Sequence, residues 1–224
     1  MTGEELEKRN IAAMGEVAGK QYSLLNNEVA ILHLYWKEYV ELFSTNQKRV
    51  DRLNQTAPGF FRMLQTELFQ TNILHLARLT DPPKTGKKEN LSLQNLPDLV
   101  ADEGLKKTLT DLLTVVTEKT EFCRDWRNRR FAHHDLALAT GASAIPLETA
   151  NKEKFNEALK ALADVINAIE GHYFKSFTSF EHIAGNRGAA TLLYVLGDGV
   201  KARERRQKAI ADGKFDELDN PEQV

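Results

Sequence analysis

Apolar residues recur at every third or fourth position along most of the chain, the spacing that lines one face of an α-helix. The first such stretch runs from Val29 to about Ser44, and the polar residues 46–56 that follow are also expected to be helical. Pro58 then opens a strongly apolar stretch that reaches Leu79. We expect this stretch to form a central core helix.

Two segments interrupt the helical pattern. Residues 81–90 (DPPKTGKKEN) contain paired prolines and a glycine, which cannot continue a helix, so we expect a loop. Ser92 is a suitable N-cap for a short helix that ends near Gly104, and a longer helix is expected to begin at Leu105. Residues 141–146 form the second break.

Helical spacing returns between Phe155 and Phe177, and no alternating strand pattern competes with it. The sequence therefore predicts an all-α fold, a bundle of about five helices over residues 1–184. Residues 185–224 differ in character, with a short apolar segment, a basic run and an acidic end. We expect them to form a C-terminal helical appendage.

Composition limits the function more than it defines it. The chain has 224 residues, of which 42% are apolar and 28% charged, as in ordinary globular proteins. Its net charge of −2 gives no general attraction to nucleic acid or membrane, so a polyanion site requires local clustering of the 30 Lys and Arg residues.

The single cysteine, Cys123, cannot form an intramolecular disulfide or a multi-cysteine zinc site. No apolar run approaches the roughly 20 residues that a membrane helix needs. We therefore expect a cytoplasmic protein that neither spans nor binds a membrane. His33 and His75 lie in apolar helical stretches and are expected to be structural histidines.

The most distinctive chemistry lies in residues 124–135 (RDWRNRRFAHHD), at the end of the helix that begins near Leu105. Projected at about 100° per residue, the apolar stripe of that helix continues into Arg127, Arg130 and His134. Charged side chains are rarely buried without partners, so the core face must open into a cleft, meet a partner chain or end here. The apolar members of the stripe are Leu105, Leu109, Leu112, Val116 and Cys123.

This cluster has three interpretations. It fits a solvated helix end, because cations suit the negative pole of the helix dipole and Asp125 can pair with Arg129. It equally fits an anion site, because guanidinium groups match phosphate and histidine titrates near neutrality. A metal site at His133, His134 and Asp135 is disfavoured, since adjacent residues diverge on a helix and the arginines repel a cation. We expect no metal and no cofactor.

The segment RNRRFAHHD is similar to a known motif. It resembles the R-N-x-x-x-A-H-x-D form of the arginine–histidine motif of the HEPN (higher eukaryote and prokaryote nucleotide-binding) superfamily. Upstream, ARLTDP at 77–82 and ENLSL at 89–93 resemble the abortive-infection, AbiU-like branch of that superfamily. The resemblance covers roughly residues 29–180. The motif matches at Arg127, Asn128, Ala132, His133 and Asp135.

The resemblance implies a helical bundle that dimerises through its motif-bearing helices and, in active members, cleaves RNA without a metal. Arg127 would bind the scissile phosphate, Asn128 would orient the phosphate or the histidine, and His133 would act as acid or base at the 2′-hydroxyl. Two protons must move, so a second motif copy in a homodimer would be chemically useful. Supporting roles are expected for Arg124, Arg130, His134 and Asp135.

Two histidines compete for the catalytic role. Six residues place Arg127 and His133 about 120° apart on a straight helix, whereas Arg127 and His134, seven apart, share a face. The motif favours His133 and unbroken helix geometry favours His134. We assign His133, because we expect the helix to fray or kink before Asp135, and we keep His134 as the alternative.

The sequence thus predicts a metal-independent HEPN endoribonuclease with RNA as substrate, acting in phage defence or as a toxin. Its partners could include a cognate antitoxin. The alternative is a non-catalytic HEPN module that binds nucleotide, RNA or a partner protein, and a third hypothesis is a plain helical scaffold. Retention of arginine, asparagine and histidine together favours the ribonuclease.

Overall fold

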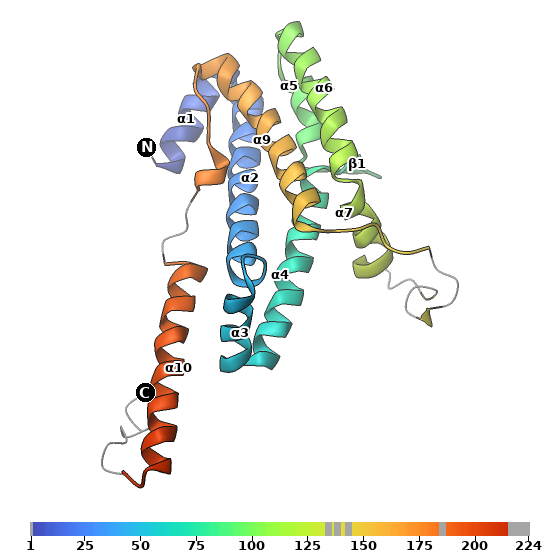
Figure 1. Ribbon diagram of the computed structural model, residues 1–224. Coiled ribbons are helices and arrows are strands. Elements are labelled where there is room, and N and C mark those ends of the chain that lie inside the picture. The colour runs from blue at the N-terminus through green and yellow to red at the C-terminus, as the bar shows by residue number, and fades with distance from the viewer. Residues whose placement is uncertain (1, 133–135, 137–139, 142–144, 184–186, 215–224) are drawn as a thin grey trace. The chain divides into compact units, whose positions relative to one another are not determined.

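A computed structural model describes residues 2–132, 136, 140–141, 145–183 and 187–214 of the chain. The predicted all-α fold is confirmed, because these residues form helices almost throughout (Figure 1). The α-helices in these ranges are α1 (Gly3–Met14), α2 (Glu16–Phe43), α3 (Gln47–Thr56), α4 (Pro58–Leu79), α5 (Leu96–Leu99), α6 (Glu103–Lys119), α7 (Glu121–Trp126), α9 (Lys152–Phe174) and α10 (Ala189–Ala211).

Shorter elements join the helices at three places. Two-residue strands β1 (Lys84–Thr85) and β2 (Lys88–Glu89) pair as an antiparallel hairpin between α4 and α5. The 3₁₀ turns η1 (Leu93–Asn95) and η3 (Phe180–His182) precede α5 and follow α9, respectively. A π-helical segment, η2 (Arg127–Ala132), continues α7.

The chain divides into two units. Unit 1 contains Met1–Trp36 and Leu68–Ala184, and unit 2 contains Lys37–Glu67 and Gly185–Val224. The long helices α2 and α4 contribute residues to both units, and α10 belongs to unit 2 together with α3. The expected boundary between a bundle of residues 1–184 and an appendage of residues 185–224 stays a prediction.

Several helix ends lie where local sequence signals place them. The second helix ends at Phe43, and Asn46 caps the next helix by accepting a hydrogen bond from the backbone N–H of Arg49. Pro58 is the first residue of α4, a position where its missing N–H costs no helical hydrogen bond. Ser92 caps η1 through the N–H of Gln94.

Several local expectations differ from the structure. The helix expected from Val29 begins at Glu16, and the one expected between Ser92 and Gly104 is η1 followed by α5, which ends at Leu99. The helix α6 begins at Glu103, two residues earlier than expected, because Asp102 caps it through the N–H of Leu105. The expected loop at residues 81–90 contains the β1–β2 hairpin, whose two-residue strands are too short to produce an alternating pattern. The short apolar segment and the basic run of the C-terminal part form one continuous helix, α10, which reaches Ala211.

The core of unit 1 contains an aromatic cluster around Phe155 of α9, which is fully buried. Trp36 stacks on Phe155 with ring centroids 4.0 Å apart, and Phe122 of α7 meets the same ring edge-on at 5.6 Å. The indole N–H of Trp36 donates to Asn156 Oδ1 at 2.8 Å. Because α6 also packs along α9, the helices that precede the motif are held by the central core (Figure 1).

A second anchor in unit 1 is a buried polar cluster at Glu170 near the end of α9. Its carboxylate accepts hydrogen bonds from Ser176 Oγ at 2.6 Å and Tyr22 Oη at 2.7 Å, and Arg9 of α1 lies at 3.4 Å. Burial alone would raise the pKa of Glu170, but these donors and the Arg9 charge outweigh it, so the pKa is lowered. The carboxylate therefore joins α1 and α2 to α9 as a charged group.

Unit 2 is held by polar contacts between α3 and α10, which pack on each other. Arg52 donates to the carbonyl of Leu193 at 3.0 Å, and Arg203 donates to the carbonyl of Gln55 at 2.7 Å. Glu38 accepts from the backbone N–H of Ala189, which satisfies one of the free donors at the start of α10. The basic residue Arg203 therefore has a structural contact within this unit.

Glu170→Ala should destabilise unit 1, because the Tyr22 hydroxyl, in a residue with no exposed surface, loses its acceptor. We expect a loss of about 2–3 kcal/mol in the free energy of unfolding, measured by urea denaturation followed by circular dichroism. Glu153→Ala, at an exposed position on the same helix, is the control and should cost under about 1 kcal/mol. Equal losses in the two variants would show that the polar cluster does not anchor α9.

Candidate functional site

The motif lies at the end of a broken helix. Chain direction changes at Thr120, where φ is −107° and ψ is 5°, and its hydroxyl donates to the carbonyl of Val116 at 2.8 Å. After the break, α7 buries Phe122 and Cys123. The predicted apolar stripe is confirmed at Leu105, Leu109, Val116 and Cys123, whereas Leu113 is buried in place of the half-buried Leu112.

Cys123 serves packing and is poorly suited to nucleophilic chemistry. Its side chain has no exposed surface, and burial raises the pKa of the thiol well above its usual range. The reactive thiolate is therefore a negligible fraction at neutral pH.

Beyond Trp126 the backbone leaves α-helical geometry. The segment η2 is a π-helix, with hydrogen bonds from residue i to i+5, and such turns frequently occur at functional sites. The 100° projection that places Arg127 and His134 on one face therefore does not apply across residues 127–132. His133, His134 and Asp135 lie outside the described residues, so the assignment between the two histidines stays a prediction.

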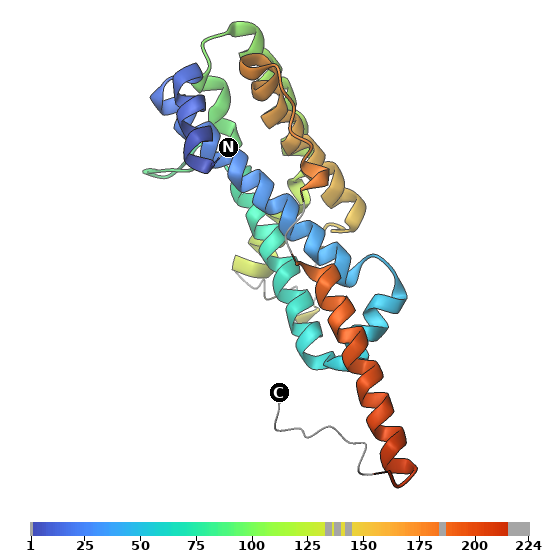
Figure 2. The same ribbon diagram turned by 90° about the vertical axis from the view of Figure 1, so that its left-hand side faces the viewer.

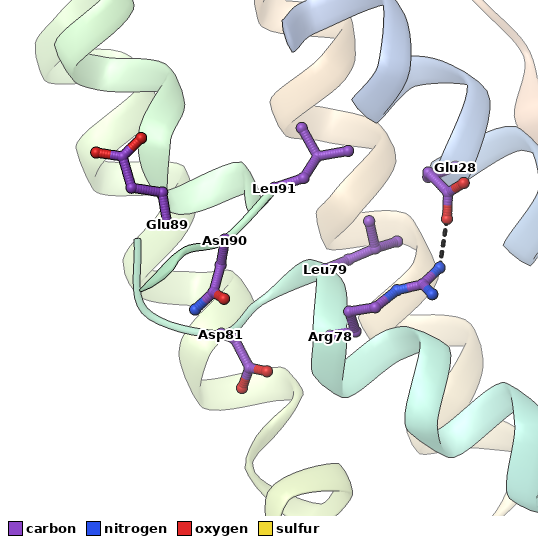
Figure 3. A pocket seen from close by; sticks show the side chains of 7 residues that line it. All are labelled: Glu28, Arg78, Leu79, Asp81, Glu89, Asn90 and Leu91. Carbon is purple, nitrogen blue, oxygen red and sulfur yellow. Dashed lines mark hydrogen bonds and ion pairs between the residues drawn. The ribbon is translucent and has the colours of Figure 1, made fainter. Parts of the chain in front are cut away.

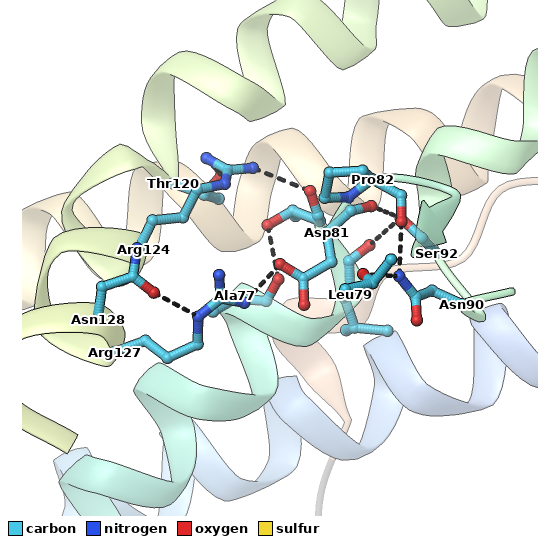
Figure 4. A network of polar contacts seen from close by, with 12 residues as sticks. Ala77, Leu79, Asp81, Pro82, Asn90, Ser92, Thr120, Arg124, Arg127 and Asn128 are labelled. Atoms are coloured by element: carbon cyan, nitrogen blue, oxygen red, sulfur yellow. Dashed lines mark hydrogen bonds and ion pairs between the residues drawn. The ribbon is translucent and has the colours of Figure 1, made fainter. Parts of the chain in front are cut away.

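Arg127 is held by two oxygen acceptors. Its Nη1 lies 2.5 Å from Oδ1 of Asp81, and its Nε donates to Oδ1 of Asn128 at 3.1 Å (Figure 4). The Arg127 side chain is 29% exposed and that of Asp81 is 22% exposed. The structure thus brings together two of the predicted catalytic residues and adds a carboxylate from 46 residues away in the sequence.

The side chain of Arg124, a predicted supporting residue, contacts the backbone of the same turn. Its Nη2 donates to the carbonyl of Thr80 at 2.9 Å, and its Nη1 lies 3.4 Å from Oγ1 of Thr120 (Figure 4). The Thr80 carbonyl belongs to the end of α4, where backbone acceptors lack helical partners. Arg124 and Arg127 therefore clamp the turn of residues 80–81 from the side of α7.

The opposite side of this turn is fixed as well. Ser92 is buried, and its Oγ donates to the carbonyl of Asp81 at 2.5 Å and lies 3.3 Å from that of Leu79. The amide of Asn90 donates to the carbonyl of Pro82 at 2.8 Å. Because its backbone is fixed in this way, the Asp81 carboxylate is a preorganised partner for Arg127.

Arg129 and Arg130 differ in their surroundings. Arg129 pairs with Asp125 at 3.1 Å and donates to the carbonyl of Ile145, and Asp125 also accepts from the N–H of Glu148 at 2.9 Å. Arg129 thus connects the motif to residues 145–148. Arg130 is exposed and forms no hydrogen bond or ion pair with another described residue.

The guanidinium of Arg127 retains capacity for an anion. The Nε donor is used by Asn128 and one Nη1 donor by Asp81, whereas Nη2 has no partner among the described residues. A guanidinium carries five N–H donors, so those of Nη2 and the second one of Nη1 remain for phosphate oxygens. Sequence reasoning missed Asp81, although the ARLTDP segment contains it, because its pairing depends on packing between α4 and α7.

Two open hollows lie on unit 1 near Glu28, whose carboxylate accepts from Arg78 at 2.5 Å and from His75 Nε2 at 2.9 Å. The first, of about 360 Å³, extends to Asp81, and Figure 3 shows the side chains around it. The second, of about 400 Å³, lies toward Tyr35 and His75.

The buried His75 is the structural histidine that the sequence predicts. Burial lowers its pKa, and the ring is held by the carboxylate of Glu28. His33 is likewise buried with a lowered pKa, and its Nε2 lies 3.2 Å from the carbonyl of Leu159. In each ring Nε2 is therefore occupied by a contact within unit 1.

Two features are absent from the described residues. They contain no group of three or more His, Cys, Asp or Glu side chains arranged to hold a metal ion. Their helices include none that is long and apolar enough to cross a bilayer.

Comparison with models of protein families identifies the family to which the chain belongs. The family model described as AbiU2, a HEPN family, matches residues 16–192, well over half of the chain. The chain belongs to the AbiU2 family of HEPN proteins. The resemblance inferred from the motif is therefore confirmed at the level of the family, within the abortive-infection branch. No curated protein and no solved structure is significantly similar to the chain.

The contact between Arg127 and Asp81 predicts energetic coupling in this AbiU2-family protein. A double-mutant cycle with Arg127→Ala and Asp81→Ala should give a coupling of about 1 kcal/mol in urea unfolding, since both side chains are partly screened by solvent. The matched cycle pairs Arg127→Ala with Asp111→Ala, a distant residue on α6 whose partner is Lys107, and should be additive within about 0.5 kcal/mol. Equal coupling in both cycles would contradict a specific ion pair.

Proposed function

We propose that this AbiU2-family protein is a metal-independent endoribonuclease, with phage defence or toxicity to the host cell as its biological role. The observation that carries the proposal is the environment of Arg127, whose side chain is oriented by Asp81 and Asn128 while its Nη2 has no partner among the described residues. Orienting the guanidinium before substrate binds reduces the entropy cost of holding a phosphate. The motif match supplies the histidine that such a site requires.

In this mechanism the 2′-oxygen of the ribose attacks the adjacent phosphorus, and the bond from phosphorus to the 5′-oxygen breaks. One acid–base group removes the 2′-hydroxyl proton and another protonates the departing 5′-oxygen. We assign one of these roles to His133, with His134 as the alternative. Arg127 binds the phosphate, and Asn128, whose oxygen accepts from Arg127, retains its amide N–H groups for the same phosphate.

The local charge supports anion binding. Residues 124–135 contain four arginines, at 124, 127, 129 and 130, and two aspartates, and Asp81 adds a third carboxylate, which leaves an excess of one positive charge. The whole chain carries a net charge of −2, so this excess is a property of the site. Arginine also matches phosphate geometry better than lysine does.

A homodimer would give this site its second acid–base group. Leu136 and Ile145, which both follow the motif in the sequence, are 76% and 80% exposed. Large apolar side chains left in water next to a functional segment favour an interface there. A two-fold axis near residues 124–136 would bring two copies of the motif together.

The reaction predicts cleavage of single-stranded RNA in the presence of EDTA, with 2′,3′-cyclic phosphate ends, whereas DNA, which lacks the nucleophile, should survive. His133→Ala should lower the rate by about 10²-fold or more, since it removes an acid–base group. Arg127→Ala should weaken both RNA affinity and rate, because phosphate is bound in ground and transition states. Gel analysis of end-labelled RNA measures both effects.

His134→Ala and Arg130→Ala are the matched controls and should be milder. A larger loss with His134→Ala would transfer the catalytic role to that residue. Binding of RNA without cleavage across several substrates would instead support the alternative, a non-catalytic HEPN module that binds RNA, nucleotide or a partner protein.

The dimer should be present at micromolar concentration in sedimentation velocity experiments. Leu136→Glu together with Ile145→Glu should dissociate it, because two buried charges per protomer would face an apolar interface. Leu24→Glu, at an exposed apolar position of α2, is the control and should leave the dimer intact. A wild-type protein that is only monomeric would contradict the shared site.

A further inference from the structure

The β1–β2 hairpin is the feature of unit 1 that neither the core nor the motif explains. It consists of residues 84–89 (KTGKKE), all of them exposed, and it carries three lysines and one glutamate. Thr85 and Lys88 pair across the hairpin, so Gly86 and Lys87 form its two-residue turn. Gly86 has φ of +61°, as type II′ turns require at this position.

A hairpin this short is marginal in water unless its base is fixed. Here Asn90 fixes the base by donating its side-chain amide to Thr85 Oγ1 at 2.8 Å and its backbone N–H to the carbonyl of Pro83 at 2.8 Å. Its first strand starts three residues after Asp81, the partner of Arg127. Three extended residues span at most about 11 Å, so the first strand of the hairpin begins within that distance of the residue that orients Arg127.

The lysines of the hairpin are available for a ligand. Lys84 pairs with Glu89 at 3.4 Å, a contact between exposed groups that contributes little. Lys87 and Lys88 have no ion-pair partner among the described residues, and Lys88 lies on the face of the hairpin opposite to Glu89. The hairpin projects from unit 1 in both ribbon views, and in Figure 1 it lies level with the junction of α6 and α7 (Figures 1 and 2).

We propose that residues 84–89 form a basic arm that binds the phosphate backbone of RNA next to the scissile phosphate. This inference rests on the proposed function and adds to it a second, sequence-independent contact with the same strand. Lysine provides a point charge without base recognition, so the arm raises affinity and leaves the choice of base to other contacts. Because the turn at residues 80–82 is fixed, the arm keeps its position relative to Asp81, the partner of Arg127.

The test compares Lys87→Ala/Lys88→Ala with Lys107→Ala/Lys160→Ala. Both variants remove two exposed charges from unit 1, the second from α6 and α9. Binding of a single-stranded RNA is measured by fluorescence anisotropy between 50 and 200 mM salt, and cleavage is measured at saturating RNA. Loss of two phosphate contacts should weaken binding about tenfold or more and reduce the salt slope by about 1.4.

The cleavage rate at saturation should stay within about twofold of wild type, because the arm binds ground and transition states alike. The control variant should bind like wild type. If the wild-type protein binds RNA and the two variants have equal affinity and salt slope, the proposed role of the arm is contradicted and the proposed function is not. A wild-type protein that neither binds nor cuts RNA would overturn the proposed function, and the arm with it.

Discussion

The candidate site depends on which donors form hydrogen bonds with the free backbone carbonyl groups at the end of α4. A helix end leaves carbonyl groups without partners, and in this chain Arg124 donates to one of them, at Thr80. That contact ties α7 to the turn that follows α4 and places Arg127 beside Asp81. The position of the predicted catalytic arginine is therefore a consequence of hydrogen bonding at a helix end.

The rigidity of this arrangement comes from packing on both sides. Ser92 fixes the turn from within the core, and Phe122 holds α7 against Phe155 of α9. Since core side chains are close-packed, neither helix can shift without losing contacts. The Asp81 carboxylate and the Arg127 guanidinium therefore keep their relative position in the absence of substrate. Preorganisation of this kind is what a phosphate site needs in order to act electrostatically.

The charges around the site have different roles although their residue types are the same. Arg124 and Arg129 bind backbone carbonyls and give shape to the segment, Arg127 is oriented yet partly open, and Arg130 is exposed. These roles differ because the arginines differ in burial and in the fixed acceptors beside them. The lysines of the hairpin add exposed positive charges along the chain after Asp81.

The sequence by itself determined the helical class, the helix ends at Phe43 and Pro58, the cap at Ser92 and the motif, because periodicity and capping act over a few neighbouring residues. Only the tertiary structure decided the rest. The pairing of Asp81 with Arg127 joins residues 46 positions apart, and no local pattern encodes such a contact. The break at Thr120 and the π-helical segment change which side chains share a face, so a projection on one straight helix could not place them. The sequence did not predict the hairpin, because strands of two residues are too short to show an alternating pattern. The position of the hairpin depends on hydrogen bonds of Asn90 and Ser92.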